Sequence, residues 1–280
     1  MPDSTAPVTL TEQQFSKIRT LVYETAGIDL KHGKEELVKA RLGKELRKQN
    51  LTSFDRYVEQ VVNDKTGESL INLINALSTN FTHFFREQKH FDYLAKTVAP
   101  RWQGRQRIDV WCAAAATGEE PYSLAITLLE SLGASAGVHI LASDISTRAL
   151  ATADAGIYPE ARLAEIPSAL KSKYFVQGKW KSEPAFRAKP ELRRLIEFRR
   201  INLIESFSHA RQFQAIFCRN VMIYFDKPTQ ERVVQRLSEW LEPGGYLFVG
   251  HAESLTGARH ALEFVIPAVY RKPGAETRRR

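Results

Sequence analysis

The residues with the clearest chemical potential form a segment in which an apolar run gives way to very small side chains. Four alanines at positions 113–116 are followed by Thr-Gly, two glutamates and Pro121. Apolar residues then recur at helical spacing, and a proline in the first turn of a helix costs no hydrogen bond. The pattern predicts a strand over 108–113, a tight turn, and a helix over 120–132. Small side chains in such a turn let a ligand lie against the backbone at the carboxyl end of the strand.

The charges near this turn indicate which ligand suits it. Paired glutamates disfavour a phosphate group, which binds best to bare N–H groups with no carboxylate nearby. Asp144 ends a second predicted strand, 138–143, where nucleoside-binding folds place an acceptor for ribose hydroxyls. Only Gly118 of the three-glycine dinucleotide fingerprint is present, which disfavours NAD. The residues favour S-adenosylmethionine, although close packing of the turn and an N-cap role for Asp144 are structural alternatives.

Two polar side chains follow a third predicted strand, 214–219. Asn220 and Tyr224 should project over the same edge of the sheet as Asp144, because parallel strands end together there. Methyltransferases that act on exocyclic nitrogens of bases often carry Pro-Pro and an aromatic after such an Asn, whereas Val221 follows here. The alternatives are that Asn220 caps a turn and that Tyr224 belongs to the core.

A third segment is rich in polar groups beside bulky aromatics. Asn80, Thr82 and Arg86 can present an amide, a hydroxyl and a guanidinium from one loop, while three phenylalanines alternate with them. The structural alternative is a helix cap formed by Asn80 or Thr82, with the aromatics packed inward.

The elements that must position these residues fall into two patterns. From about 10 to 90 the periodicity is helical, with helices expected near 11–27, 34–49, 53–63 and 68–77. Strands and helices alternate afterwards, which predicts a mainly parallel, doubly wound α/β sheet. Further strands are expected at 195–201, 245–250 and within 264–271, and helices near 146–153 and at 228–241. The resulting division is a helical domain (1–92), a basic linker (93–106) and an α/β domain (107–280) that contains a small inserted β subdomain (about 157–194).

Composition limits the partners and the compartment. The 280-residue chain has a formal charge of +8, which favours an anionic partner without identifying it. Its two cysteines, Cys112 and Cys218, provide neither a disulfide framework nor a metal site, so buried thiols in the cytoplasm and no metal are predicted. No apolar run is long enough to span a bilayer and no secretory signal is visible, so no membrane insertion is expected.

Together these segments resemble the chemotaxis receptor glutamate methyltransferases, the CheR family. The matching motifs, in order from about residue 12 to 272, lie at 79–87, 111–123, 142–144, 202–203, 217–225 and 250–253 (Gly-His-x-Glu). The resemblance implies an all-helical N-terminal domain that faces the receptor, followed by a Rossmann-like S-adenosylmethionine-dependent methyltransferase domain with a small inserted β subdomain. It implies methyl transfer to glutamate side chains of methyl-accepting chemotaxis receptors, with S-adenosylhomocysteine as the second product. The cytoplasmic domains of these receptors would be the partners, and the inserted subdomain is a place for a regulatory protein.

The resemblance also assigns roles to individual residues. The positions that match the family's cofactor contacts are Asn80, Thr82, Arg86, Glu120, Asp144, Asn202, Leu203, Asn220 and Val221. Arg86 and Tyr224 match residues beside the transferred methyl group and are the expected catalytic pair. Arg41, Lys44 and Arg47, spaced by three along one predicted helix, match a basic ridge that faces the acidic receptor.

The chain departs from the family pattern at two positions. Ala116 replaces a common serine in the cofactor turn, and Trp180 replaces the second glycine of a Gly-x-Gly found in members that bind a receptor's C-terminal pentapeptide. The resemblance therefore does not extend to that docking route.

Three other functions compete with this interpretation. A nucleic-acid methyltransferase fits the positive charge, but no recognised RNA- or DNA-binding module is visible, so no nucleic acid is predicted as partner. A nucleoside-binding module without catalysis is disfavoured by Arg86, Asp144 and Tyr224 occurring together, and a dehydrogenase by the missing glycines.

Overall fold

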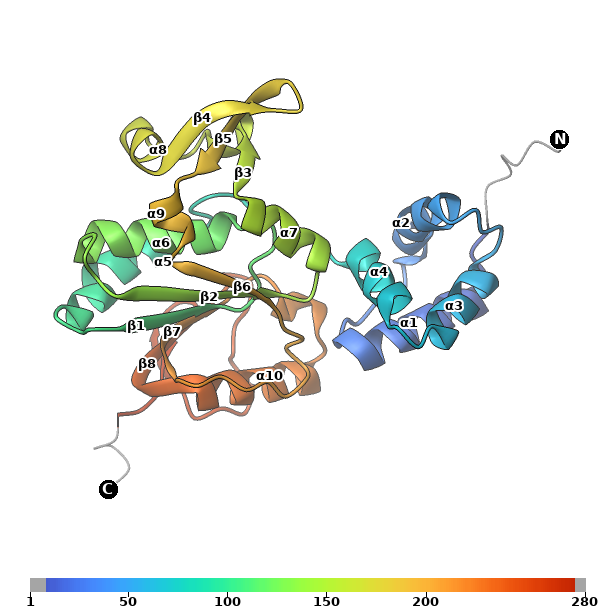
Figure 1. Ribbon diagram of the computed structural model, residues 1–280. Coiled ribbons are helices and arrows are strands. Elements are labelled where there is room, and N and C mark those ends of the chain that lie inside the picture. Colours follow the sequence, from blue (N-terminus) through green and yellow to red (C-terminus); the bar gives the residue numbers. More distant parts are fainter. Residues whose placement is uncertain (1–8, 275–280) are drawn as a thin grey trace. The chain divides into compact units, whose positions relative to one another are not determined.

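The computed structural model describes residues 9–274, which fold into two compact units. One unit contains the chain up to Thr79 together with Tyr224–Asp226, and the other contains Asn80–Ile223 and the chain from Lys227 (Figure 1). Within the described residues, no helix has the length and apolar character needed to cross a membrane.

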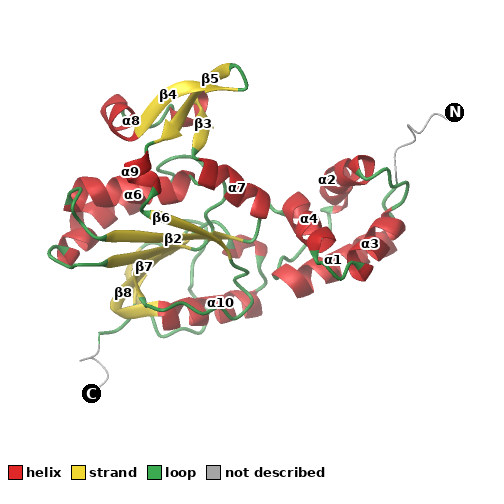
Figure 2. Ribbon diagram, in the orientation of Figure 1, coloured by secondary structure: helices red, strands yellow, loops and turns green. Residues whose placement is uncertain are grey.

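The smaller unit is helical, as the periodicity predicts (Figure 2). Its helices are α1 (Glu12–Ala26), α2 (Glu35–Lys48), α3 (Phe54–Asn63) and α4 (Glu68–Leu77). A capping box between Thr11 and Gln14 starts α1, and Gly27 ends it at a φ of 70°. Each helix turns one apolar stripe inward, so that Ile18, Val38 and Leu42 are fully buried in a shared core.

The larger unit is built on a seven-stranded sheet of order β6-β2-β1-β7-β8-β10-β9. Its strands are β1 (Ile108–Cys112), β2 (Val138–Asp144), β6 (Ile196–Arg200), β7 (Phe213–Cys218), β8 (Leu241–Val249), β9 (Glu263–Ile266) and β10 (Val269–Arg271). The first five strands in this order pair in parallel, and β10 and β9 add to β8 as antiparallel strands. The predicted doubly wound sheet is confirmed.

Helices lie on both faces of this sheet. In Figure 1, α6 (Glu119–Leu132) and α7 (Thr147–Ala155) lie on one side of the strands and α10 (Lys227–Trp240) on the other. The chain builds outward from β1 through β2 to β6 and then returns to the other side of β1 as β7. The strand order therefore reverses between β1 and β7, and open α/β sheets bind ligands at the carboxyl ends of the strands at such a point.

Residues 93–106, predicted as a linker, are instead mostly helical and contribute to the core. After α5 (Lys89–Tyr93), a π-helical turn η1 (Leu94–Val98) and a 3-10 turn η2 (Ala99–Trp102) continue the helix. Leu94, Val98 and Trp102 recur every four residues and are buried, whereas Arg101 and Arg105, basic residues of the predicted linker, are exposed. The division of the chain falls at Thr79 and Asn80 rather than after residue 92.

The segment expected as an inserted β subdomain forms a separate three-stranded antiparallel sheet, β3-β5-β4. Its strands are β3 (Ile157–Pro159), β4 (Phe175–Trp180) and β5 (Glu183–Ala188), and the turn η3 (Glu160–Leu163) and two short helices, α8 (Ser168–Tyr174) and α9 (Pro190–Arg193), lie in the same segment. Trp180 ends β4 with half of its surface exposed.

Candidate functional site

The alanine-rich turn joins β1 to α6 and is shaped by two unusual backbone conformations. Ala116 has a φ of 47° and Gly118 a φ of 100°. A Cβ atom at Gly118 would lie 2.5 Å from the Tyr158 hydroxyl and 2.8 Å from the Ala153 Cβ, so only glycine fits. The tight turn follows from this packing, and it leaves the Ala116 N–H directed toward β2.

Asp144 ends β2 and receives that N–H. Its carboxylate accepts hydrogen bonds from the backbone N–H groups of Ala116 and Ser146, both at 2.9 Å. Burial raises the pKa of Asp144, and these N–H donors oppose the shift. Ser146, rather than Asp144, is the N-cap of α7, because its hydroxyl accepts from Ala149 N. The remaining lone pairs of Asp144 suit the hydroxyls of a ribose.

Asn202 and Leu203 lie in the loop that follows β6, beside a pocket of about 360 Å³. Trp111 and Phe207 supply aromatic walls to this pocket, which suits a planar ring. The Asn202 amide donates to Glu205 at 2.8 Å, which fixes its orientation.

Glu120, in the first turn of α6, is part of a buried ion pair. Its carboxylate accepts from the Arg219 guanidinium at 2.7 Å and from the Cys112 thiol at 3.3 Å. Burial raises the pKa of Glu120, and Arg219 opposes this shift. The side chain of Arg219 has no exposed surface, and it also donates to Glu87 at 3.0 Å and to the Arg86 carbonyl. Arg219 thus joins α6, the segment after β7 and the loop that contains Arg86.

The loop of residues 80–88 supplies the third set of polar groups. Asn80 donates to the Ser146 hydroxyl at 3.3 Å, Thr82 is buried, and the Arg86 guanidinium donates to the Phe81 carbonyl at 3.1 Å. These residues form a loop rather than a helix start, and α5 begins only at Lys89, so neither Asn80 nor Thr82 caps a helix.

Strained backbone conformations occur at several residues near the carboxyl ends of the strands. Among the described residues, eight non-glycine residues have positive φ, and four of them are Phe85, Glu87, Ala116 and Asn220. Such conformations cost free energy for a residue with a side chain and persist where surrounding contacts hold them, frequently at functional sites.

Asn220 has a φ of 58°, and its turn is held from two sides. Its backbone N–H donates to Glu253 at 2.7 Å and its side-chain amide to Glu87 at 3.3 Å. Val221 follows it, half-buried, before the 3-10 turn η4 (Met222–Tyr224). Asn220 therefore belongs to a strained turn at a strand end.

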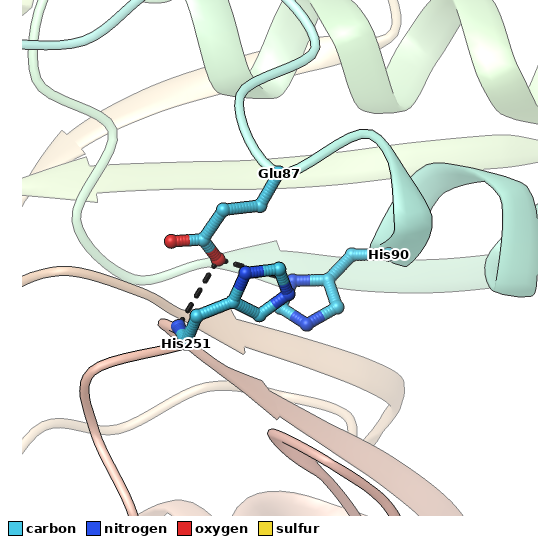
Figure 3. A group of neighbouring side chains, drawn as sticks. All are labelled: Glu87, His90 and His251. Carbon is cyan, nitrogen blue, oxygen red and sulfur yellow. Dashed lines mark hydrogen bonds and ion pairs between the residues drawn. The ribbon is translucent and has the colours of Figure 1, made fainter.

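Glu87, His90 and His251 form a cluster in which a carboxylate oxygen and two imidazole nitrogens lie within 4.8 Å of one another (Figure 3). These are ligand types that zinc uses. The Glu87 carboxylate, however, already accepts from Arg219 and from the His251 backbone N–H at 3.2 Å. A cation placed there would meet the guanidinium, so the cluster is better explained as support for the loop.

Tyr224 is grouped with the helical unit, where its carbonyl accepts from Asp29 N at 2.8 Å. Tyr224 is half-buried. Its position directly after the Asn220 turn agrees with the order of the motif.

The three basic residues of α2 are not equivalent. Lys44 and Arg47 are exposed, but Arg41 directs its guanidinium to the end of α4, where it donates to the Leu77 and Ser78 carbonyls and to the Thr79 hydroxyl. Arg41 therefore has a structural role at the end of α4, because cations bind favourably to the free carbonyls at a helix C-terminus, and a basic ridge that faces the receptor stays a prediction.

Two family models match the chain. The all-alpha domain of CheR methyltransferases matches residues 13–78, and the SAM binding domain of CheR methyltransferases matches residues 80–270. This chain belongs to the CheR methyltransferase family. It is an S-adenosylmethionine-dependent methyltransferase, and the remaining acceptor capacity of Asp144 fits the ribose hydroxyls of that cofactor. The expected fold of a helical domain and a methyltransferase domain is confirmed.

Curated relatives of the CheR family are similar over nearly the whole chain. Chemotaxis protein methyltransferase 2 of Pseudomonas aeruginosa is 44% identical over 262 residues, which cover 93% of each chain. The chemotaxis protein methyltransferase of Salmonella typhimurium is 42% identical over 254 residues, 90% of this chain and 87% of its own. That of Borreliella burgdorferi is 36% identical over 275 residues, 95% and 96% of the two chains.

Sequence reasoning missed several residues that organise the site. Arg219, Glu87, Glu253 and His90 were not assigned roles, although they are buried or half-buried among the predicted site residues. A charged residue such as Arg219 directly after a mostly apolar strand was the available signal, because buried charges need partners.

Proposed function

We propose that this protein transfers the methyl group of S-adenosylmethionine to glutamate side chains of methyl-accepting chemotaxis receptors and forms glutamyl methyl esters. Membership of the CheR family supports the reaction class. The observation that carries the proposal is that Arg219 holds the Arg86 loop and the Asn220 turn together, 133 residues apart, at the edge where Asp144 ends β2. Relatives named chemotaxis protein methyltransferases support the receptor as substrate.

Methyl transfer to a glutamate side chain involves little proton transfer. A glutamate with a pKa of about 4.3 is already ionised at neutral pH, so no general base is required. The carboxylate oxygen bonds to the methyl carbon as the carbon–sulfur bond breaks, and the electron pair stays on sulfur in S-adenosylhomocysteine. The protein's contribution is alignment and exclusion of water.

Arg86 and Tyr224 are proposed to position the substrate carboxylate. A guanidinium orients a carboxylate through paired hydrogen bonds, and a phenol fixes one oxygen by donating to it. The bond from Arg86 to the Phe81 carbonyl uses one of its five N–H donors, so others stay available.

The cofactor is proposed to be held by Asp144 at the ribose, by Asn202 and Leu203 beside the aromatic-lined pocket, and by the turn at Asn220 and Val221. Asn80, Thr82, Arg86 and Glu120 complete the proposed set. Glu120 keeps acceptor capacity beyond its bonds to Arg219 and Cys112, which suits a cationic group.

Receptor recognition is proposed to use Lys44 and Arg47 on α2, whose exposed charges suit an acidic partner.

A regulatory protein at the inserted subdomain is a separate proposal. There β4 is an edge strand of the three-stranded sheet, and Val176 and Trp180 expose apolar surface on it.

Incubation of the protein with labelled S-adenosylmethionine and receptor-containing membranes tests the proposal. We expect base-labile label on receptor glutamates, because methyl esters hydrolyse in base. Arg86→Ala and Tyr224→Phe should each lower turnover on the order of 10- to 100-fold through lost alignment. Arg105→Ala, which removes a surface pair with Glu242, is the control and should keep the wild-type rate.

Two results would contradict the proposal. Label that resists base, or that appears on nucleic acid added to the same reaction, would exclude glutamate esters as the product. Wild-type rates in both site variants would remove Arg86 and Tyr224 from the mechanism.

A further inference from the structure

The Gly-His-x-Glu motif at 250–253 has no role in the functions described above, yet its glutamate is among the most buried charged residues of the methyltransferase unit. The motif follows β8 directly, and Glu253 is 6% exposed. A buried carboxylate without compensating donors is strongly unfavourable, so its hydrogen bonds indicate its purpose.

These hydrogen bonds come from the backbone of the turn after β7. The Glu253 carboxylate accepts from Asn220 N at 2.7 Å and from Ile223 N at 3.2 Å, and it closes its own loop by accepting from Gly250 N at 2.6 Å. Burial raises the pKa of Glu253, and these backbone donors oppose the shift. One side chain therefore fixes both ends of the segment from Asn220 to Ile223.

Gly250 explains why the contact is so close. A Cβ atom at this position would lie 2.5 Å from the Asn220 side-chain nitrogen, 2.7 Å from a Glu253 oxygen and 3.0 Å from Asn220 N. The loop after β8 thus lies directly against the strained Asn220, whose positive φ needs external contacts to persist. Glu87, from a different loop, holds the Asn220 amide at 3.3 Å (the carboxylate seen in Figure 3).

We propose that Glu253 is a positioning residue for S-adenosylmethionine: it holds the turn from Asn220 to Ile223 in the conformation that binds the cofactor. The inference rests on the proposed cofactor contacts of Asn220 and Val221. Glu253 itself contacts backbone N–H groups and acts only through the turn. A glutamine of the same shape would present an amide N–H to at least one of these donors and release part of the turn.

Calorimetric titration with S-adenosylhomocysteine tests the proposal without any receptor. Glu253→Gln should raise the Kd at least about tenfold, because a lost hydrogen bond to a charged group corresponds to a factor of that order. In turnover measurements the KM for S-adenosylmethionine should rise while the KM for receptor stays unchanged. Gly250→Ala, which places a Cβ atom 2.5 Å from the Asn220 side-chain nitrogen, should weaken binding in the same way and replaces Glu253→Gln if that variant folds poorly.

The matched control is Asp109→Asn. Asp109 is also a buried carboxylate (3% exposed), but it lies near the amino end of β1, where Arg107 binds it. Asp109→Asn should lower the unfolding temperature and leave the Kd unchanged. A folded Glu253→Gln with wild-type affinity would overturn the positioning role, whereas a failure to methylate receptors would affect only the proposed function.

Discussion

Arg219 shows how one buried charge can organise a binding edge. Its guanidinium contacts the carboxylates of Glu120 and Glu87 and the carbonyl of Arg86. Removing one partner of a buried pair leaves an uncompensated charge, which costs far more than a surface pair contributes. The three segments around Arg219 therefore depend on one another, and the strain at Glu87 and Asn220 persists because this network holds it.

His90 gives the stability of the protein a predictable pH dependence. It is 1% exposed, and burial lowers its pKa to about 4, with the charge of Arg219 acting in the same direction and Glu87 and His251 beside it. An unfolded histidine titrates near 6.5, so the unfolded state binds more protons between pH 4 and 6.5. The stability that His90 contributes is complete above about pH 6.5 and is lost as the pH falls toward 4.

The comparison of wild type with His90→Phe isolates this contribution. The free energy of unfolding of the wild type should fall by on the order of 2–3 kcal/mol more than that of the variant across this window. Phenylalanine keeps an aromatic ring against Phe248 and does not titrate. Denaturant titrations at several pH values measure the difference, and parallel pH curves for the two proteins would contradict the assignment.

At the residue level, the sequence predicts which polar side chains lie at the ends of strands, but it does not predict which residues they contact. Asp144 and Asn220 were placed correctly at the carboxyl edge, because strand ends follow from hydrophobic pattern. The pairing of Arg219 with Glu120 joins positions 99 residues apart, and the use of Arg41 at the end of α4 joins positions 36 apart. No local pattern encodes such distances.

Among the elements, the turn between β1 and α6 leaves no room for a larger residue at Gly118. Gly118→Ala places a Cβ against Tyr158 and Ala153 and also forces alanine into a positive φ. The overpacking should cost about 1–3 kcal/mol of stability beyond the backbone strain. Affinity for S-adenosylhomocysteine should fall as well, because the Ala116 N–H that binds Asp144 lies in this turn.

Gly67, the residue before α4, provides the control because it has the same left-handed conformation and the same place before a helix as Gly118. Its φ is 76°, and a Cβ atom added there would meet no other atom within 4 Å, so Gly67→Ala carries the backbone strain alone. Denaturant unfolding and calorimetry of both variants give the comparison. Equal losses of stability would show that packing against Tyr158 is unimportant.

The elements also show where sequence patterns were sufficient. Alternation of strands and helices predicted the parallel part of the sheet, and the strand expected within 264–271 is present as the pair β9 and β10. The prediction of a linker was wrong because it followed the basic composition of the segment and not the four-residue spacing of Leu94, Val98 and Trp102, which indicates a helix. Charged residues on the exposed face of a helix are compatible with a buried apolar stripe.

For the molecule as a whole, the distribution of unpaired charge determines which surface attracts an acidic substrate protein. The formal charge of +8 resides in the methyltransferase unit, because the helical unit has 11 basic and 12 acidic side chains, and charges that already have partners contribute little to an acidic surface approaching from solution. Arg41 is engaged within the helical unit, so reversing its charge would disturb α4 rather than test recognition. Lys44 and Arg47, the exposed cations of α2, are therefore the positions at which charge reversal tests receptor recognition.

The double reversal Lys44→Glu with Arg47→Glu should therefore slow receptor methylation on the order of tenfold at low salt, because it removes electrostatic attraction during association. The wild-type rate should fall as ionic strength rises toward 1 M, where screening acts over about 3 Å, and the variant should depend less on salt. Binding of S-adenosylhomocysteine should stay unchanged in the variant. The control, Arg56→Glu with Lys65→Glu, makes the same change of charge at exposed positions in and after α3 of the same unit. If both double variants slow methylation equally, net charge rather than α2 guides the receptor, and the proposed recognition surface is wrong.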